Sequence, residues 1–220
     1  GLSPKSNVTL RGTGRTKLKL FNSATTNLIH YYNDVELVNF NMYGITLDGN
    51  SQKVYDVIYI SQPNPTVPDK TWYMSVVDNC QIVNGKIGIN CPIPGSVKII
   101  NSLIQGNDIG IKQQAEHFYL TNTVIWGNRI GADLGKANHF NWHNAVIAHN
   151  SEVGILSSLS GAGSFQNGFI GCSFIDNPKC FNGQSQRFRF VGCRFIDSDF
   201  GLYNINSFTI VTGCEFHNLG

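Results

Sequence analysis

Short runs of apolar residues recur along the chain, and each run begins two residues after an Asn or a Cys. The motif is Asn or Cys, any residue, then two apolar residues, and its last copy is degenerate. Counted from the first copy, successive copies are 21, 21, 22, 28, 21 and 21 residues apart, which indicates an internal repeat. The copies start at Cys80, Asn101, Asn122, Asn144, Cys172, Cys193 and Cys214.

A second motif keeps the same period: an Asn is followed within four residues by a Gly and an apolar residue. Clear copies occupy residues 84–89, 107–111 and 128–132. Asn and Gly tolerate left-handed backbone angles, so they suit sharp corners between short strands. The unit contains no amphipathic helical stretch and cannot bury its own apolar face, but stacked units can. We therefore expect each unit to form one coil whose short strands pair in parallel with the next coil, about 4.8 Å away.

The predicted fold is all-β: a single-stranded parallel β-helix with rungs of about 21 residues. The hand expected for parallel connections is right-handed. Residues 1–220 form one domain, with loop insertions near 61–71, which contains three Pro, and near 156–164, which is rich in Gly and Ser. A solenoid needs covered ends, so we expect the chain to be part of a longer polypeptide or to be capped by partner chains.

Stacking predicts internal columns of equivalent residues. Aligned on the motif, Asn101, Asn122 and Asn144 continue the column of Cys172, Cys193 and Cys214, whose thiols we expect to be small buried apolar groups. A disulfide between neighbouring rungs is geometrically allowed, but three cysteines cannot all pair. The same alignment predicts a second column of large apolar groups: Leu103, Val124, Val146, Phe174, Phe195 and Phe216. A third contains Ile104, Ile125, Ile147, Ile175 and Ile196.

Composition and charge exclude several classes of protein. The chain has 25 Asn and 23 Gly but only 16 Lys plus Arg, and its formal net charge is +2. No basic stripe is visible, so we expect no nucleic-acid partner. No apolar run is long enough to predict a membrane span. Hydrophobic residues make up 41% of the chain, which excludes a disordered tail.

Residues 6–14 (SNVTLRGTG) and 38–50 (VNFNMYGITLDGN) resemble the first coils of pectate-lyase-like β-helix proteins, and the later rungs resemble the same superfamily. The paired Asp and Gly-His-Gly motifs of polygalacturonases and the Arg-x-Pro-x-x-Arg motif of pectate lyases are absent. The chain is therefore most similar to bacteriophage tailspike or tail-appendage proteins. This resemblance implies a right-handed β-helix, a homotrimer, other virion tail proteins as partners, and a place in the virion tail. It also implies binding, and in many members cleavage, of a bacterial surface polysaccharide.

Two alternatives are open at this stage. One is a structural shaft or adhesin module without catalysis, and the other is a secreted bacterial polysaccharide lyase or hydrolase. Sugar cleavage commonly uses two carboxylates. Asp176 and Asp197 each follow an Ile of the third column, 21 residues apart, so we expect them side by side on the outer face. They can equally be solvated turn residues.

Glu152 with Asp133 is a second candidate carboxylate pair, although Lys112 can pair with Asp133, and Asp108 with Arg129. Exposed aromatic faces stack on sugar rings, so Trp126, Trp142 and Trp72 are candidate binding platforms, and Trp126 takes an outward position after Ile125. Trp142 and Trp72 can instead pack under insertions or at a subunit interface. The sequence predicts no metal site and no cofactor.

Overall fold

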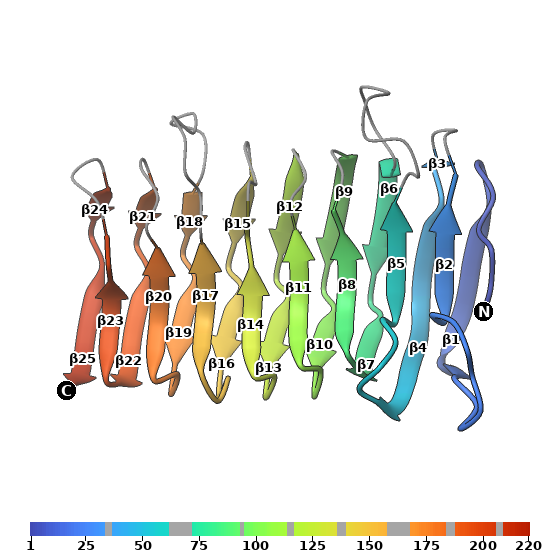
Figure 1. The fold of residues 1–220 in the computed structure, drawn as a ribbon. Coiled ribbons are helices and arrows are strands. Elements are labelled where there is room, and N and C mark those ends of the chain that lie inside the picture. Colours follow the sequence, from blue (N-terminus) through green and yellow to red (C-terminus); the bar gives the residue numbers. More distant parts are fainter. Residues whose placement is uncertain are drawn as a thin grey trace.

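The computed structural model describes residues 1–33, 37–61, 72–92, 95–113, 117–135, 140–157, 168–183, 188–205 and 209–220. Its strands pair in parallel and stack along one axis, with the two termini at opposite ends (Figure 1). In that part of the chain there is no helix, and therefore none long and apolar enough to cross a membrane. Most of each predicted insertion, residues 62–71 and 158–164, lies outside the described residues, while Leu156 and Ser157 belong to a strand.

Three faces make up the solenoid. The first face contains β3 (Leu37–Val38), β6 (Trp72–Asp78), β9 (Gly95–Ile100), β12 (Phe118–Thr121), β15 (Asn141–His143), β18 (Gly168–Ile170), β21 (Arg189–Val191) and β24 (Ile210–Thr212). The second contains β7 (Gln81–Gly85), β10 (Leu103–Gln105), β13 (Val124–Trp126), β16 (Val146–Ala148), β19 (Ser173–Ile175), β22 (Arg194–Ser198) and β25 (Glu215–Leu219).

The long strands β1 (Thr9–Lys19) and β4 (Asn41–Gln52) run through both of these faces and join them into one 17-stranded sheet. The third face is a separate sheet of eight strands, which stand in a row in Figure 1. It consists of β2 (Ile29–Tyr32), β5 (Ile58–Ser61), β8 (Ile87–Cys91), β11 (Ile109–Gln113), β14 (Ile130–Asp133), β17 (Val153–Ser157), β20 (Lys179–Gly183) and β23 (Phe200–Tyr203). One rung is thus three short strands, such as β12, β13 and β14.

The register confirms the predicted repeat but corrects its phase. Val146 pairs with Ser173 and Ile147 pairs with Phe174, so the copies that begin with Asn are one residue out of step with those that begin with Cys. A shift of one residue moves a strand side chain to the opposite face. The buried apolar column is therefore Ile82, Ile104, Ile125, Ile147, Phe174 and Phe195, and Leu103, Val124 and Val146 face outward.

The corrected phase also separates the Asn residues from the Cys residues. Asn101, Asn122 and Asn144 occupy the corner that Gly171, Gly192 and Gly213 occupy in later rungs, and all of them have positive φ. Inside that corner, the column of Cys172 and Cys193 continues through small buried residues: Ser102, Thr123 and Ala145. The prediction of buried thiols is confirmed for Cys172 and Cys193, whereas Cys214, in the last rung, is only half-buried. The two buried thiols donate to carbonyl oxygens of the preceding rung, as Cys172 Sγ does to Trp142 O at 3.3 Å.

Aromatic stacking fills the C-terminal half of the core. The rings of Phe174 and Phe195 are parallel within 5° with centroids 4.9 Å apart, and Phe195 and Phe216 repeat this at 7° and 4.8 Å. These spacings match the rise of the solenoid because identical side chains occupy one column in successive rungs. Phe216 lies in the last rung and is 45% exposed.

Candidate functional site

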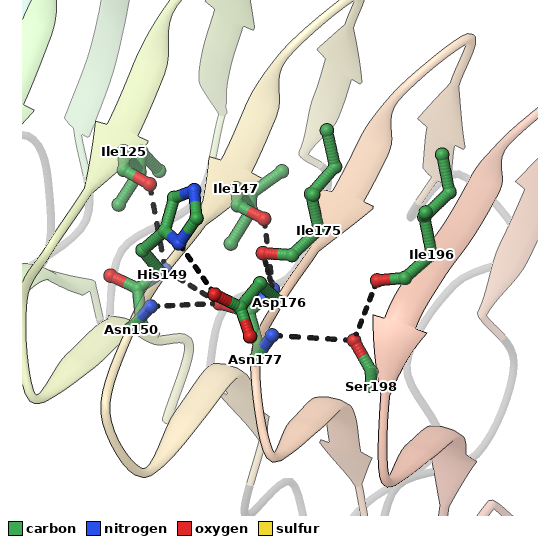
Figure 2. Close-up of polar contacts among 9 residues, drawn as sticks. All are labelled: Ile125, Ile147, His149, Asn150, Ile175, Asp176, Asn177, Ile196 and Ser198. Atoms are coloured by element: carbon green, nitrogen blue, oxygen red, sulfur yellow. Dashed lines mark hydrogen bonds and ion pairs between the residues drawn. The ribbon is translucent and has the colours of Figure 1, made fainter. Parts of the chain in front are cut away.

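A buried ladder of asparagines forms the corner between the second and third faces. Asn107, Asn128, Asn150 and Asn177 occupy this corner in four successive rungs, and each is at most 2% exposed. The Nδ2 of each donates to the Oδ1 of the next, at 3.2, 3.1 and 2.9 Å. Figure 2 shows the C-terminal end of the ladder, Asn150 and Asn177, where the backbone N–H of Asn177 donates to Ser198 Oγ at 3.2 Å. The ladder holds the exposed residue before each Asn at a defined place.

The residues that precede the ladder form an exposed column on the outer surface of this corner. His149, Asp176 and Asp197 all adopt positive φ, of 53°, 48° and 50°. Because Ile175 pairs with Ile196, Asp176 and Asp197 hold equivalent positions in adjacent rungs, as the sequence predicted, and both are exposed. Each carboxylate contacts a different neighbour. Asp197 Oδ1 accepts a hydrogen bond from Asn218 Nδ2 at 2.8 Å, on the side away from Asp176.

Asp176 is hydrogen bonded to a histidine that sequence reasoning did not single out. Its Oδ2 lies 2.6 Å from His149 Nδ1, one rung away (Figure 2). The side chains are 40% and 62% exposed, so both groups are accessible from solution. The sequence carries a signal for this pair: His149 directly precedes ladder residue Asn150, just as Asp176 directly precedes Asn177.

Trp126 lies on the same corner and extends this arrangement. Its ring centroid is 4.0 Å from that of His149, with a tilt of 51° between the planes. Trp126 is 40% exposed and follows buried Ile125, which confirms its predicted outward position. Trp126, His149 and Asp176, which we call the corner strip, therefore run across three consecutive rungs, with His149 in contact with the other two.

The other two tryptophans are not on the surface. Trp72 and Trp142 are each 0% exposed, so the expectation that they offer sugar-binding platforms is wrong. Trp142 pairs in register with Leu120 and Phe169, and its ring meets that of Phe169 edge-on at 5.4 Å. Both tryptophans are core residues of the first face, where an inward strand position excludes solvent.

A column of alternating charge runs beside the corner strip, on the third-face side of the ladder. It contains Lys86, Asp108, Arg129 and Glu152, in successive rungs. Arg129 Nε donates to Asp108 Oδ1 at 2.7 Å, and Arg129 also forms an ion pair with Glu152. The hydrogen bond from Arg129 lowers the pKa of Asp108 below its ordinary value. The predicted pairing of Asp108 with Arg129 is confirmed.

Glu152 does not pair with Asp133 as expected. Its neighbour Val153 is in register with Ile130, so Glu152 lies beside Arg129, while Asp133 aligns with Leu156 three positions further along the strand. The charge of Glu152 is thus compensated within the charge column. Among the described residues, no group of three or more His, Cys, Asp or Glu side chains could hold a metal ion.

The corner strip combines two chemical capacities. The exposed indole of Trp126 offers an apolar face, to which the C–H surface of a pyranose ring can stack. A carboxylate beside Nδ1 of His149 favours the tautomer with the proton on Nδ1, which leaves Nε2 available to accept a proton. An imidazole oriented in this way by a carboxylate is the arrangement used for general acid–base catalysis.

Comparison with known proteins gives matches in structure only. No protein-family model matches the sequence, and no curated protein sequence matches it. The A-module of Azotobacter vinelandii mannuronan C-5 epimerase AlgE4 superposes with a TM-score of 0.68 at 14% identity, covering 99% of this chain and 81% of that one. The enzymatically active domain of tailspike protein 2 from bacteriophage CBA120 superposes with a TM-score of 0.61 at 13% identity. That match covers 98% of this chain and 36% of the tailspike chain.

The chain has the right-handed parallel β-helix fold. The A-module of AlgE6 from the same bacterium agrees, with a TM-score of 0.55 at 15% identity over 98% of this chain and 84% of that one. The fold expected from the repeat and from the resemblance is therefore confirmed. In this β-helix, the corner strip lies where the second face turns into the third.

Proposed function

We propose that this β-helix binds a bacterial surface polysaccharide and cleaves it at the corner strip. The observation that carries the proposal is the hydrogen bond between His149 and Asp176 beside the exposed ring of Trp126. Neighbours of the same fold support the substrate class, because one acts on mannuronan and another is the enzymatically active domain of a phage tailspike. The finer proposal is a phage tail appendage: a homotrimer, attached to other tail proteins, that meets the bacterial surface.

In the proposed mechanism, Trp126 holds one sugar ring and His149 transfers a proton. Asp176 accepts the Nδ1–H hydrogen bond and stabilises the imidazolium that forms when Nε2 takes a proton. Asp197 supplies a second carboxylate one rung away. The two residues hold equivalent positions one rung, about 4.8 Å, apart, but their carboxylates turn to opposite sides, Asp176 toward His149 and Asp197 toward Asn218. To act as the close carboxylate pair of a retaining glycosidase, Asp197 would have to turn from Asn218 toward Asp176.

The test compares Asp176→Asn, Asp197→Asn and His149→Ala with the unaltered chain on purified capsular and O-polysaccharides. New reducing ends report cleavage, and ultraviolet absorbance of unsaturated products separates a lyase from a hydrolase. We expect His149→Ala and Asp176→Asn to lower the rate at least about 100-fold, the contribution typical of general acid–base catalysis. Asp199→Asn, which removes an exposed carboxylate two residues after Asp197, is the matched control and should retain full activity.

An unchanged cleavage rate in Asp176→Asn would show that the corner strip is not the catalytic site. Binding without cleavage by the unaltered chain would instead support a non-catalytic shaft or adhesin. A second candidate function, a secreted bacterial polysaccharide-modifying enzyme, is favoured by the epimerase A-module, because this chain spans 81% of that module but 36% of the tailspike chain. Epimerised but uncut product, detected by NMR of the polysaccharide, would identify that activity.

A further inference from the structure

A second row of asparagines follows the opposite corner of the β-helix, between the first and second faces, and its amides are exposed. Asn79, Asn101, Asn122 and Asn144 occupy this corner in four successive rungs, with φ between 49° and 52°. Asn122 Nδ2 donates to Asn101 Oδ1 at a long 3.4 Å, and Asn101 Nδ2 donates to Asp78 Oδ1 at 3.1 Å. A primary amide has two N–H donors and two acceptor lone pairs, so each retains capacity for a ligand.

An open groove of about 290 Å³ lies along this row. It crosses five rungs, from the glycine-bearing corner of β1 and β4 to β13. Its polar lining consists mainly of neutral side chains that both donate and accept hydrogen bonds, and its apolar lining includes the outward aliphatic groups Leu103 and Val124. The described residues that line it include no Asp, Glu, Lys, Arg or His, although Asp78 lies just outside it, bonded to Asn101. The polar lining residues include Thr46, Asn79, Gln81, Asn101 and Asn122.

The backbone of this corner does not itself require an amide side chain. In the last three rungs the same position is Gly171, Gly192 and Gly213, with φ of 63°, 59° and 61°. Glycine adopts this left-handed conformation at no steric cost. Asn79, Asn101 and Asn122 line the groove at this corner, Gly14 and Gly44 line its N-terminal end, and Asn144 continues the row one rung beyond it. Turn geometry accounts for either residue, whereas only the amide can bond a ligand.

We propose that this groove, which we call the amide groove, binds an uncharged, extended stretch of a polysaccharide that lies parallel to the solenoid axis. The rise of one rung, about 4.8 Å, is close to the length of one pyranose unit in an extended glycan, so successive amides meet successive sugars. Sugar hydroxyl groups donate and accept, as the amides do. The C–H faces of the rings cover Leu103 and Val124. The amide groove is a separate subsite from the corner strip, and its ligand class rests on the proposed function.

The experiment uses substitutions that already occur at this corner. The double variant Asn101→Gly/Asn122→Gly removes two amides from the amide groove while keeping a residue that suits positive φ. Asn144→Gly makes the same change one rung beyond the groove and is the matched control. Binding is measured by calorimetry with size-defined fragments of neutral capsular and O-polysaccharides, and with mannuronan fragments as the anionic comparison. Thermal melting of each variant monitors folding.

We expect the double variant to lose at least about tenfold in affinity for a neutral fragment, as removal of two hydrogen-bonding groups predicts, and Asn144→Gly to bind like the unaltered chain. Affinity should change little between low and high salt, because the groove has no charged lining. Equal binding by the double variant, with binding by the unaltered chain intact, would overturn the amide groove and leave the proposed function standing. Failure of the unaltered chain to bind any fragment would overturn both.

Discussion

Asn107 and Asn128 lie one rung apart, and Asn128 Oδ1 accepts two hydrogen bonds from Asn107, from its Nδ2 at 3.2 Å and from its backbone N–H at 3.0 Å. Asn128 repeats both contacts with Asn150 at 3.1 Å. Its Nδ2 also donates to Ile104 O at 3.3 Å. One buried side chain thus satisfies polar groups in both neighbouring rungs, and the ladder couples the rungs that position the corner strip.

Replacing Asn128 with Ala should destabilise the β-helix by at least about 2 kcal/mol. The substitution leaves the N–H groups of Asn107 and the Oδ1 of Asn150 with fewer partners in a buried environment, and an unsatisfied buried polar group costs about 1–3 kcal/mol. Urea denaturation followed by circular dichroism measures the effect as a lower midpoint. Asn144→Gly, at an exposed corner, should change stability by less than about 0.5 kcal/mol. Equal effects of the two substitutions would mean that the ladder does not couple the rungs.

The phenylalanine stack predicts that truncating a ring costs more stability inside the stack than at its C-terminal end. Phe195 packs between two parallel rings and is 0% exposed, so Phe195→Ala should cost about 3–5 kcal/mol, the range for truncating a buried Phe. Phe216 has only one ring beside it and is 45% exposed, so Phe216→Ala should cost clearly less. Denaturation midpoints of the two variants provide the comparison. A loss from Phe216→Ala as large as that from Phe195→Ala would indicate that the last rung is as well packed as the core.

Asp56 and Asp108 predict two pH dependences of opposite sign. Burial raises the pKa of Asp56 above 3.8, so this carboxyl costs the native state stability that grows as the pH rises from the unfolded to the folded pKa, and the cost is absent below the unfolded pKa. Asp56→Asn should therefore raise the melting temperature at about pH 7, and the gain should vanish near about pH 3. Melting curves over this range measure the difference.

Asp108 provides the contrasting case. The hydrogen bond from Arg129 lowers the pKa of Asp108, so its ionised form contributes stability above the unfolded pKa, and this is lost as the pH falls through the folded pKa. Asp108→Asn should lower the melting temperature at neutral pH, by an amount equivalent to less than about 1 kcal/mol because the pair is exposed. The deficit should shrink on acidification. A deficit that persists at low pH would point to lost packing instead of lost charge.

The period of the repeat, and with it the fold, could be predicted from the sequence because stacking forces similar residues into equivalent positions. The residue-by-residue alignment of the copies that begin with Asn on those that begin with Cys could not be predicted. Asn101 and Cys172 both stand before two apolar residues, and only the pairing of Val146 with Ser173 reveals that one is an exposed corner residue and the other is buried. In a strand, an error of one residue exchanges inside and outside.

This one-residue misalignment also explains which site residues could be predicted from the sequence. Asp176 and Asp197 were placed in equivalent corners because both lie in the Cys-type repeats, whose phase was right. His149 lies in an Asn-type repeat, and a one-residue error there hid its alignment with Asp176. Trp142 lies between the outward residues Asn141 and His143, so no motif fixed its inward orientation.

Trp126, which is exposed and contacts His149, and Trp142, which is buried, should respond differently to substitution. Trp126→Ala should lower the affinity for the polysaccharide about tenfold, because the exposed ring supplies the apolar face for stacking. The same substitution should leave the melting temperature almost unchanged. Trp142→Ala should instead destabilise the fold by about 3–5 kcal/mol, since it empties a buried site beside Phe169. Calorimetric titration and thermal melting of both variants separate the two roles. If Trp126→Ala binds normally while His149→Ala still loses cleavage, the ligand contacts the imidazole without stacking on the indole, and the binding surface must extend from His149 toward Asp197 instead.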